Sequence, residues 1–120
     1  MLRVVVADDS RVMRQIVVRT LRQAGYDWDI TEATDGAEAF AIARAEQPDL
    51  VLSDWNMPNM TGIDLLRALR AAGDDVPFGF VTSEGSPEMR EKAANAGAIF
   101  LIAKPFNEDT FKEHLDGVIS

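Results

Sequence analysis

The chain has 120 residues, 47% of them hydrophobic, which fits a single domain spanning residues 1–120 with one core. Twelve Lys and Arg residues against twenty Asp and Glu residues give a net charge of −8, which disfavours binding to nucleic-acid phosphates or to anionic lipid. The absence of cysteine excludes disulfides and cysteine-ligated metal sites.

In chain order, five short apolar runs have the length of β-strands, and a segment with helical spacing of apolar residues follows each run. The runs are nearly continuous rather than alternating in polarity, which is typical of strands covered on both faces. The predicted strands are Leu2–Ala7, Trp28–Glu32, Leu50–Ser53, Phe78–Thr82 and Ile99–Ala103, of which the second is the weakest. The helical segments lie at 13–21, 37–41, 65–69, 89–96 and 111–118.

The first helical segment has two distinct sides. The side expected to face the core contains Met13, Ile16, Val17 and Leu21. The opposite side, expected to face solvent or else an acidic partner, contains Arg11, Arg14, Arg19 and Arg22. Ser10 precedes this segment and is suited to cap it.

Five consecutive βα units predict an α/β fold, with one parallel sheet and helices on both of its faces. Ligands of such sheets bind beyond the carboxyl ends of the strands. Polar or charged residues end four of the five predicted strands, namely Asp8 and Asp9, Asp54, Thr82, and Lys104. We therefore expect these side chains to meet at one edge of the sheet.

Three carboxylates gathered there would raise one another's pKa values unless a cation neutralised them. Oxygen ligands without histidine or cysteine favour Mg²⁺, for which Mn²⁺ or Ca²⁺ could substitute. The positions of Thr82 and Lys104 make sense if an anion also binds, since a hydroxyl and an ammonium can both contact phosphoryl oxygens. One carboxylate could then act as the nucleophile.

Four segments now carry a family resemblance: "VVVADDS", "LVLSDWNMPNMTG", "FVTSEG" and "FLIAKPF". With them the chain resembles, from end to end, the receiver domain of bacterial two-component response regulators, especially the single-domain chemotaxis regulators. The resemblance implies a flavodoxin-like (βα)₅ fold with strand order 2-1-3-4-5. It also implies a monomeric signalling protein that catalyses only its own phosphorylation and dephosphorylation. The lack of cysteine leads us to expect it in the cytoplasm. The absence of a leader pattern and of an apolar stretch near the roughly 18 residues of a membrane span agrees with this location.

The resemblance further implies that Asp54 accepts a phosphoryl group from a histidine kinase or a phosphotransfer protein. Asp9, Asp54 and the backbone carbonyl of Asn56 would bind Mg²⁺, and Asp8 would reach it through water. Thr82 and Lys104 would hold the phosphoryl oxygens.

Two further expectations follow from the resemblance. The Lys104–Pro105 peptide bond should be cis. Asn56 and Glu84 should influence the rate at which water hydrolyses the phosphorylated aspartate.

The switch is expected to begin with Thr82, whose hydroxyl would turn toward the phosphoryl group and draw Ser83 and the following loop with it. This movement would change the face made by the fourth helix, the fifth strand and the fifth helix, and so control a partner such as a flagellar motor switch protein. Many relatives have an aromatic residue three positions before the lysine, where this chain has Leu101. Phe100 should point to the opposite side of its strand.

Five other functions remain open on the sequence alone. The domain could be a phosphorelay intermediate or a phosphate sink. A metal-dependent aspartyl-phosphate phosphatase would need an aspartate where Ser10 or Arg11 stands. A flavin-binding module would need a phosphate-binding loop instead of two carboxylates. An interaction domain without phosphorylation would not need the acid, threonine and lysine set.

Overall fold

The computed structural model describes residues 2–117, and its five strands form one parallel sheet in the order β2-β1-β3-β4-β5. The strands are β1 (Arg3–Ala7), β2 (Asp29–Ala33), β3 (Leu50–Ser53), β4 (Phe78–Thr82) and β5 (Phe100–Ala103). Every boundary lies within one residue of its predicted position. The predicted fold class and strand order are confirmed.

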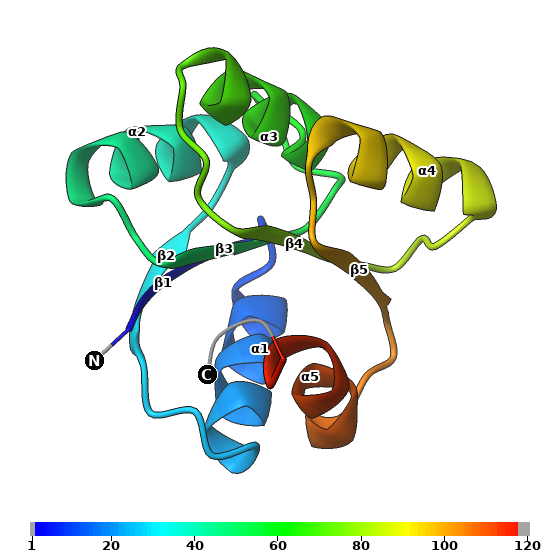
Figure 1. Cartoon of the computed structure of the whole chain (residues 1–120). Helices are drawn as coiled ribbons and strands as arrows, with labels where there is room; N and C mark the ends of the chain where they lie inside the picture. The colour runs from blue at the N-terminus through cyan, green and yellow to red at the C-terminus, as the bar shows by residue number, and fades with distance from the viewer. Residues whose placement is uncertain (1, 118–120) are drawn as a thin grey trace.

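A helix follows each strand: α1 (Arg11–Gln23), α2 (Gly36–Glu46), α3 (Gly62–Ala71), α4 (Pro87–Ala96) and α5 (Glu108–Leu115). Helices α2, α3 and α4 cover one face of the sheet, and α1 and α5 cover the other (Figure 1). The predicted helical residue Val118 lies outside the described residues. Among residues 2–117, no helix combines the length and apolar character needed to cross a membrane.

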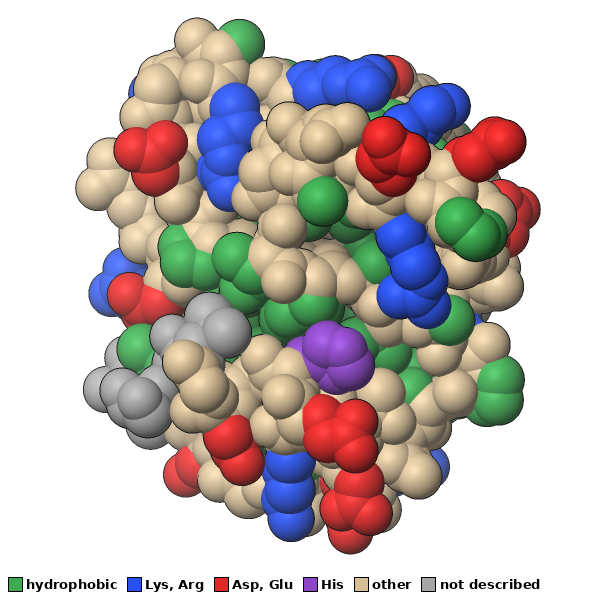
Figure 2. Space-filling view, turned by 45° about the vertical axis from the view of Figure 1, so that its right-hand side comes forward, with side chains coloured by type: hydrophobic (Ala, Val, Ile, Leu, Met, Phe, Trp, Pro, Cys, Tyr) green, Lys and Arg blue, Asp and Glu red, His purple; other side chains and the backbone are tan. Residues whose placement is uncertain are grey.

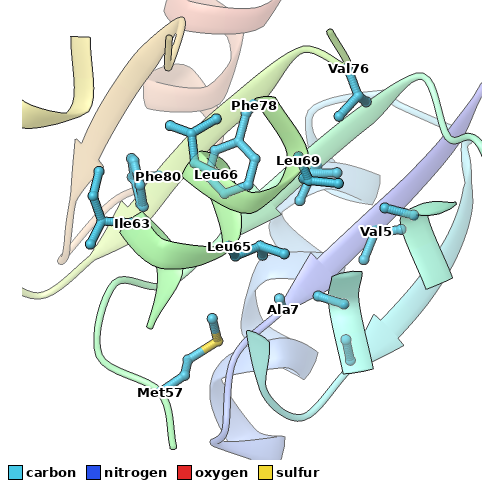
Figure 3. Packing of buried hydrophobic residues seen from close by; sticks show 14 of the residues in the cluster. Val5, Ala7, Met57, Ile63, Leu65, Leu66, Leu69, Val76, Phe78 and Phe80 are labelled. Atoms are coloured by element: carbon cyan, nitrogen blue, oxygen red, sulfur yellow. The ribbon is translucent and has the colours of Figure 1, made fainter. Parts of the chain in front are cut away.

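The hydrophobic core consists of two clusters, one on each side of the sheet. Alternate residues of β1 enter opposite clusters, with Val5 on the α2–α3 side and Val4 on the α1–α5 side. This is why the strand is apolar throughout its centre. In the first cluster, residues Leu65, Leu66 and Leu69 of α3 lie close to the phenylalanines of β4 (Figure 3).

Helix α1 departs from its prediction at two positions. Ile16 was expected in the core but is 37% exposed, and Thr20 takes an inner position with its hydroxyl donating to the Ile16 carbonyl (2.7 Å). The Arg14 side chain was expected in solvent but is only 11% exposed. Ser10 caps the helix as predicted, its hydroxyl accepting from the Met13 N–H.

Candidate functional site

The carboxyl ends of β1 and β3 bring three acidic side chains together. These strands are neighbours, with Ala7 opposite Ser53 in the register, so the residues that follow them leave the sheet side by side. Asp8, Asp9 and Asp54 each offer one carboxylate oxygen, and these three oxygens lie within 4.8 Å of one another. The set consists of hard oxygen donors, which is the chemistry that Mg²⁺ requires.

Asp8 is the most enclosed of the three acids, with 4% of the residue exposed. Burial raises the pKa of its carboxyl above the ordinary value, and the charge of Asp54 acts in the same direction. The Ser10 N–H, which donates to Oδ1 at 2.9 Å, and the nearby Lys104 ammonium act against this rise. The buried charge therefore depends on neighbouring groups that stabilise it.

Asp54 is held by its backbone as well as by its side chain. Its N–H donates to the Ala7 carbonyl (2.9 Å), and its Oδ1 accepts from the Trp55 N–H (2.7 Å). A Cβ at Gly62 would collide with the Asp54 carbonyl oxygen, so α3 can begin this close only with glycine at its first position. The Asp54 carboxylate is consequently fixed in direction.

Lys104 follows β5 and reaches across the edge of the sheet to the acids. Its Nζ lies 3.3 Å from Asp8 Oδ2 and 3.5 Å from Asp54 Oδ2, and its side chain is 15% exposed. Its N–H donates to the Thr82 carbonyl (2.8 Å), and its peptide bond to Pro105 is cis. One ammonium thus contacts carboxylates that follow two different strands.

Thr82 ends β4 and is fully buried. Its hydroxyl oxygen accepts from the Glu84 N–H at 3.4 Å, while Ser83 and Glu84 are exposed. The Glu84 side chain accepts from Asn56 Nδ2 at 3.4 Å. The side chains of Asn56 and Glu84 therefore meet although the two residues follow different strands.

Leu101 and Phe100 lie on opposite sides of β5, as predicted. Leu101 is 6% exposed and belongs to the cluster on the α4 side, whereas Phe100 packs with the other cluster and its ring lies 5.4 Å from that of His114. Phe100 therefore does not take the place that an aromatic residue at position 101 would occupy.

Arg14 is the residue at this edge that sequence reasoning missed. Its Nη1 donates to the Asp8 carbonyl oxygen (2.7 Å), and its Nε pairs with Glu32 on β2 (2.9 Å). It thereby braces the backbone of the acid pair. The only available signal was its position one helical turn after the cap Ser10.

Comparisons with known proteins agree with this geometry. Residues 4–116 match the family model of the response regulator receiver domain. The chain is 39% identical to chemotaxis protein CheY-3 of Vibrio cholerae, covering 98% of this chain and 91% of that one, and 36% identical to chemotaxis protein CheY of Pseudomonas aeruginosa, covering 98% and 95%. The solved structure of Vibrio cholerae chemotaxis protein CheY4 superposes with a TM-score of 0.87 at 37% identity, covering 99% of both chains. The chain therefore belongs to the response regulator receiver domain family.

Proposed function

We propose that this chain is a phosphorylation-activated switch in which Asp54 accepts a phosphoryl group from the phosphohistidine of a kinase or phosphotransfer protein. Receiver domains act as switches in two-component signalling, and this chain has the architecture of one. The observation that carries the proposal is the position of the Asp54 carboxylate. It lies beside two further acids and 3.5 Å from the Lys104 ammonium.

Asp54 is the best placed of the three acids to be the nucleophile. Its side chain is 12% exposed, and one of its oxygens lies near Lys104 while the other accepts from the Trp55 N–H. Asp8 has only 5% of its side chain exposed, so a donor has less access to it. Asp9 is exposed, and the ion pairs of Lys104 within residues 2–117 are with Asp8 and Asp54 instead.

The transfer forms one bond and breaks another. An Asp54 carboxylate oxygen attacks phosphorus, and the bond from phosphorus to the donor's imidazole nitrogen breaks. The imidazole keeps that electron pair and takes up a proton, which leaves an acyl phosphate on Asp54. Lys104 balances negative charge on the phosphoryl oxygens, and the Thr82 hydroxyl can donate to one of them.

A divalent cation fits the same edge of the sheet. Asp8, Asp9 and Asp54 supply hard oxygen ligands within 4.8 Å of one another, and the backbone carbonyl of Asn56 would be the remaining protein ligand. These residues would hold Mg²⁺, for which Mn²⁺ or Ca²⁺ could substitute. When bound, the ion withdraws negative charge from the phosphoryl oxygens.

The output would pass through the loop after β4 to the face formed by α4, β5 and α5. A bond from Thr82 to the phosphoryl group exists only in the phosphorylated state, so it can shift the population of loop conformations. The named relatives are chemotaxis proteins, which supports a chemotaxis partner such as a flagellar motor switch protein. Asn56 and Glu84 would control access of water to the acyl phosphate.

Mass spectrometry of the intact protein tests the nucleophile. With Mg²⁺ and acetyl phosphate, we expect one phosphoryl adduct that survives acid and is lost in base. Asp54→Asn should abolish it, because an amide is a much weaker nucleophile than a carboxylate. Asp75→Asn, the same change at an exposed residue of the α3–β4 connection, is the control and should retain the adduct. An adduct on Asp54→Asn, or none on the unsubstituted chain, would contradict the proposal.

A further inference from the structure

One arginine connects the loop after β4 to strand β5. Arg90 lies on α4, and its Nε donates to the Gly85 carbonyl oxygen at 3.1 Å. Its Nη1 donates to the Leu101 carbonyl oxygen at 3.0 Å. A planar guanidinium fixes the directions of both bonds, so a single side chain holds the loop and the strand in one relative position.

The same loop begins at the candidate site. The Thr82 hydroxyl accepts from the Glu84 N–H, and the Thr82 carbonyl accepts from the Lys104 N–H. Gly85 is the next residue along the loop and is already bound to Arg90. A loop that follows Thr82 toward Asp54 therefore strains this pair of bonds, because the guanidinium cannot follow Gly85 without leaving the Leu101 carbonyl oxygen.

Arg90 also shapes the surface beyond the loop. Together with Ala94 and the 42% exposed Ile99, it lines a hollow of about 100 Å³ on the face where α4 meets β5. Figure 2 shows this side of the molecule, with hydrophobic side chains exposed between charged ones and beside the histidine. Movement of the Arg90 guanidinium would thus alter the loop and this face together.

At position 101, the link between the loop and β5 is made by the backbone and not by the side chain. The Leu101 side chain is buried in the core and forms no hydrogen bonds, so it cannot respond to a polar change at Thr82. Its carbonyl oxygen, in contrast, accepts a charge-assisted hydrogen bond from Arg90, which is stronger than a neutral one. The link between loop and strand therefore uses the main chain of residue 101.

From these contacts we infer that Arg90 is a positioning residue that holds the loop of residues 83–86 in the conformation in which the Thr82 hydroxyl accepts from the Glu84 N–H, and so sets the switching equilibrium. The inference rests on the proposed phosphorylation of Asp54. Both Arg90 bonds are made in that conformation, and their removal lowers the free-energy cost of leaving it. Loss of the guanidinium should make the phosphorylated conformation easier to reach.

Binding of BeF₃⁻, a mimic of a phosphoryl group on a carboxylate, tests this inference in the presence of Mg²⁺. Of the two tryptophans, Trp55 adjoins Asp54, so a change in tryptophan fluorescence on addition of BeF₃⁻ is the signal. Arg90→Met retains an apolar side chain but removes both donors, and we expect its apparent Kd to fall about three- to tenfold. Arg90→Lys, which keeps the charge but lacks the fork of donors, should shift in the same direction. General destabilisation would weaken binding, not strengthen it.

Lys92→Met is the matched control, since it removes one positive charge from an exposed position of the same helix. It should bind BeF₃⁻ as the unsubstituted chain does. Equal or weaker binding by Arg90→Met, or an equal gain by Lys92→Met, would overturn the inference.

Hydrogen exchange separates this inference from the proposed function. Without phosphorylation or BeF₃⁻, the backbone amides of residues 83–86 should exchange faster in the Arg90→Met variant than in the Lys92→Met variant. This measurement does not require phosphorylation. If the unsubstituted chain fails to respond to BeF₃⁻, the proposed function fails, and faster exchange still supports the role of Arg90 in holding the loop. Unchanged exchange would overturn that role.

Discussion

The edge formed by β1 and β3 and the loop that follows β4 are held in different ways. At the edge, Asp8 and Asp54 each donate a backbone hydrogen bond to a neighbouring strand, and α3 packs directly on Asp54 through Gly62. In the loop, residues 83, 84 and 86 are exposed. The bonds to the loop come mainly from side chains, such as that of Arg90 to Gly85.

This difference teaches how one domain can combine chemistry with switching. A nucleophile and its neighbouring charges must be held in place before the reaction, because electrostatic stabilisation depends on preorganised groups. A switching segment must instead have conformations of similar free energy, and exposed loops with few buried contacts meet that requirement. Substitutions at the edge formed by β1 and β3 and in the loop after β4 should therefore affect different quantities, namely phosphorylation and stability at the edge and hydrolysis at the loop.

Removal of the Lys104 charge should have the largest effect of the substitutions considered, and it acts at the edge formed by β1 and β3. In Lys104→Met we expect acetyl phosphate to phosphorylate Asp54 at least about 100-fold more slowly, because a preorganised cation beside the phosphoryl oxygens is lost. The same variant should bind Mg²⁺ more tightly, because an ammonium no longer competes for the carboxylates of Asp8 and Asp54. Mass spectrometry of the adduct over time measures the phosphorylation rate. A titration of tryptophan fluorescence with Mg²⁺ measures the affinity for the ion.

Lys92→Met is the control for this charge change and should leave both quantities unaltered. An unchanged phosphorylation rate in Lys104→Met would show that the reaction does not need the Lys104 ammonium. Weakening of Mg²⁺ binding would show that Lys104 organises the acids and does not compete for them.

Substitution of Gly62 should disturb the support beneath Asp54. A Cβ there would collide with the Asp54 carbonyl oxygen and lie 3.0 Å from the Phe80 ring, so Gly62→Ala should lower the free energy of unfolding by about 1–3 kcal/mol. Gly117→Ala is the control, because a Cβ at that position meets nothing within 4 Å. Urea unfolding measures the free energy of unfolding of both variants. Equal values would show that α3 can shift away from Asp54 without loss of stability, and would contradict this prediction.

Loss of the contact between Asn56 and Glu84 should have the smallest effect. The two side chains meet at 3.4 Å in an exposed position, and such contacts contribute at most about 1 kcal/mol. In Glu84→Ala we expect hydrolysis of the acyl phosphate to be faster, by about fivefold at most, since water reaches Asp54 more easily. Decay of the adduct after removal of acetyl phosphate is the measurement, with Glu91→Ala on α4 as the control. A slower decay would reverse the role proposed for Glu84.

Much of the fold and of the site could be predicted because the relevant information is local. Continuous apolar runs place the five strands within one residue, and the polar residues that end them identify the edge where Asp8, Asp9 and Asp54 meet. The order of the strands is different. Parallel βα units alone leave several orders open, and the choice of 2-1-3-4-5 came from the family resemblance.

Local patterns along the chain were enough to predict the elements, the acid cluster and the lysine that follows the last strand, because each depends on residues close together in the chain or on the ends of strands in one sheet. The packing of the folded chain was needed to show that Ile16 is exposed, that Arg14 donates to the Asp8 carbonyl and that Arg90 joins the loop to β5. Long arginine side chains can reach several neighbours at similar cost. Which one they bind depends on how the helices finally pack, and no local pattern records that choice.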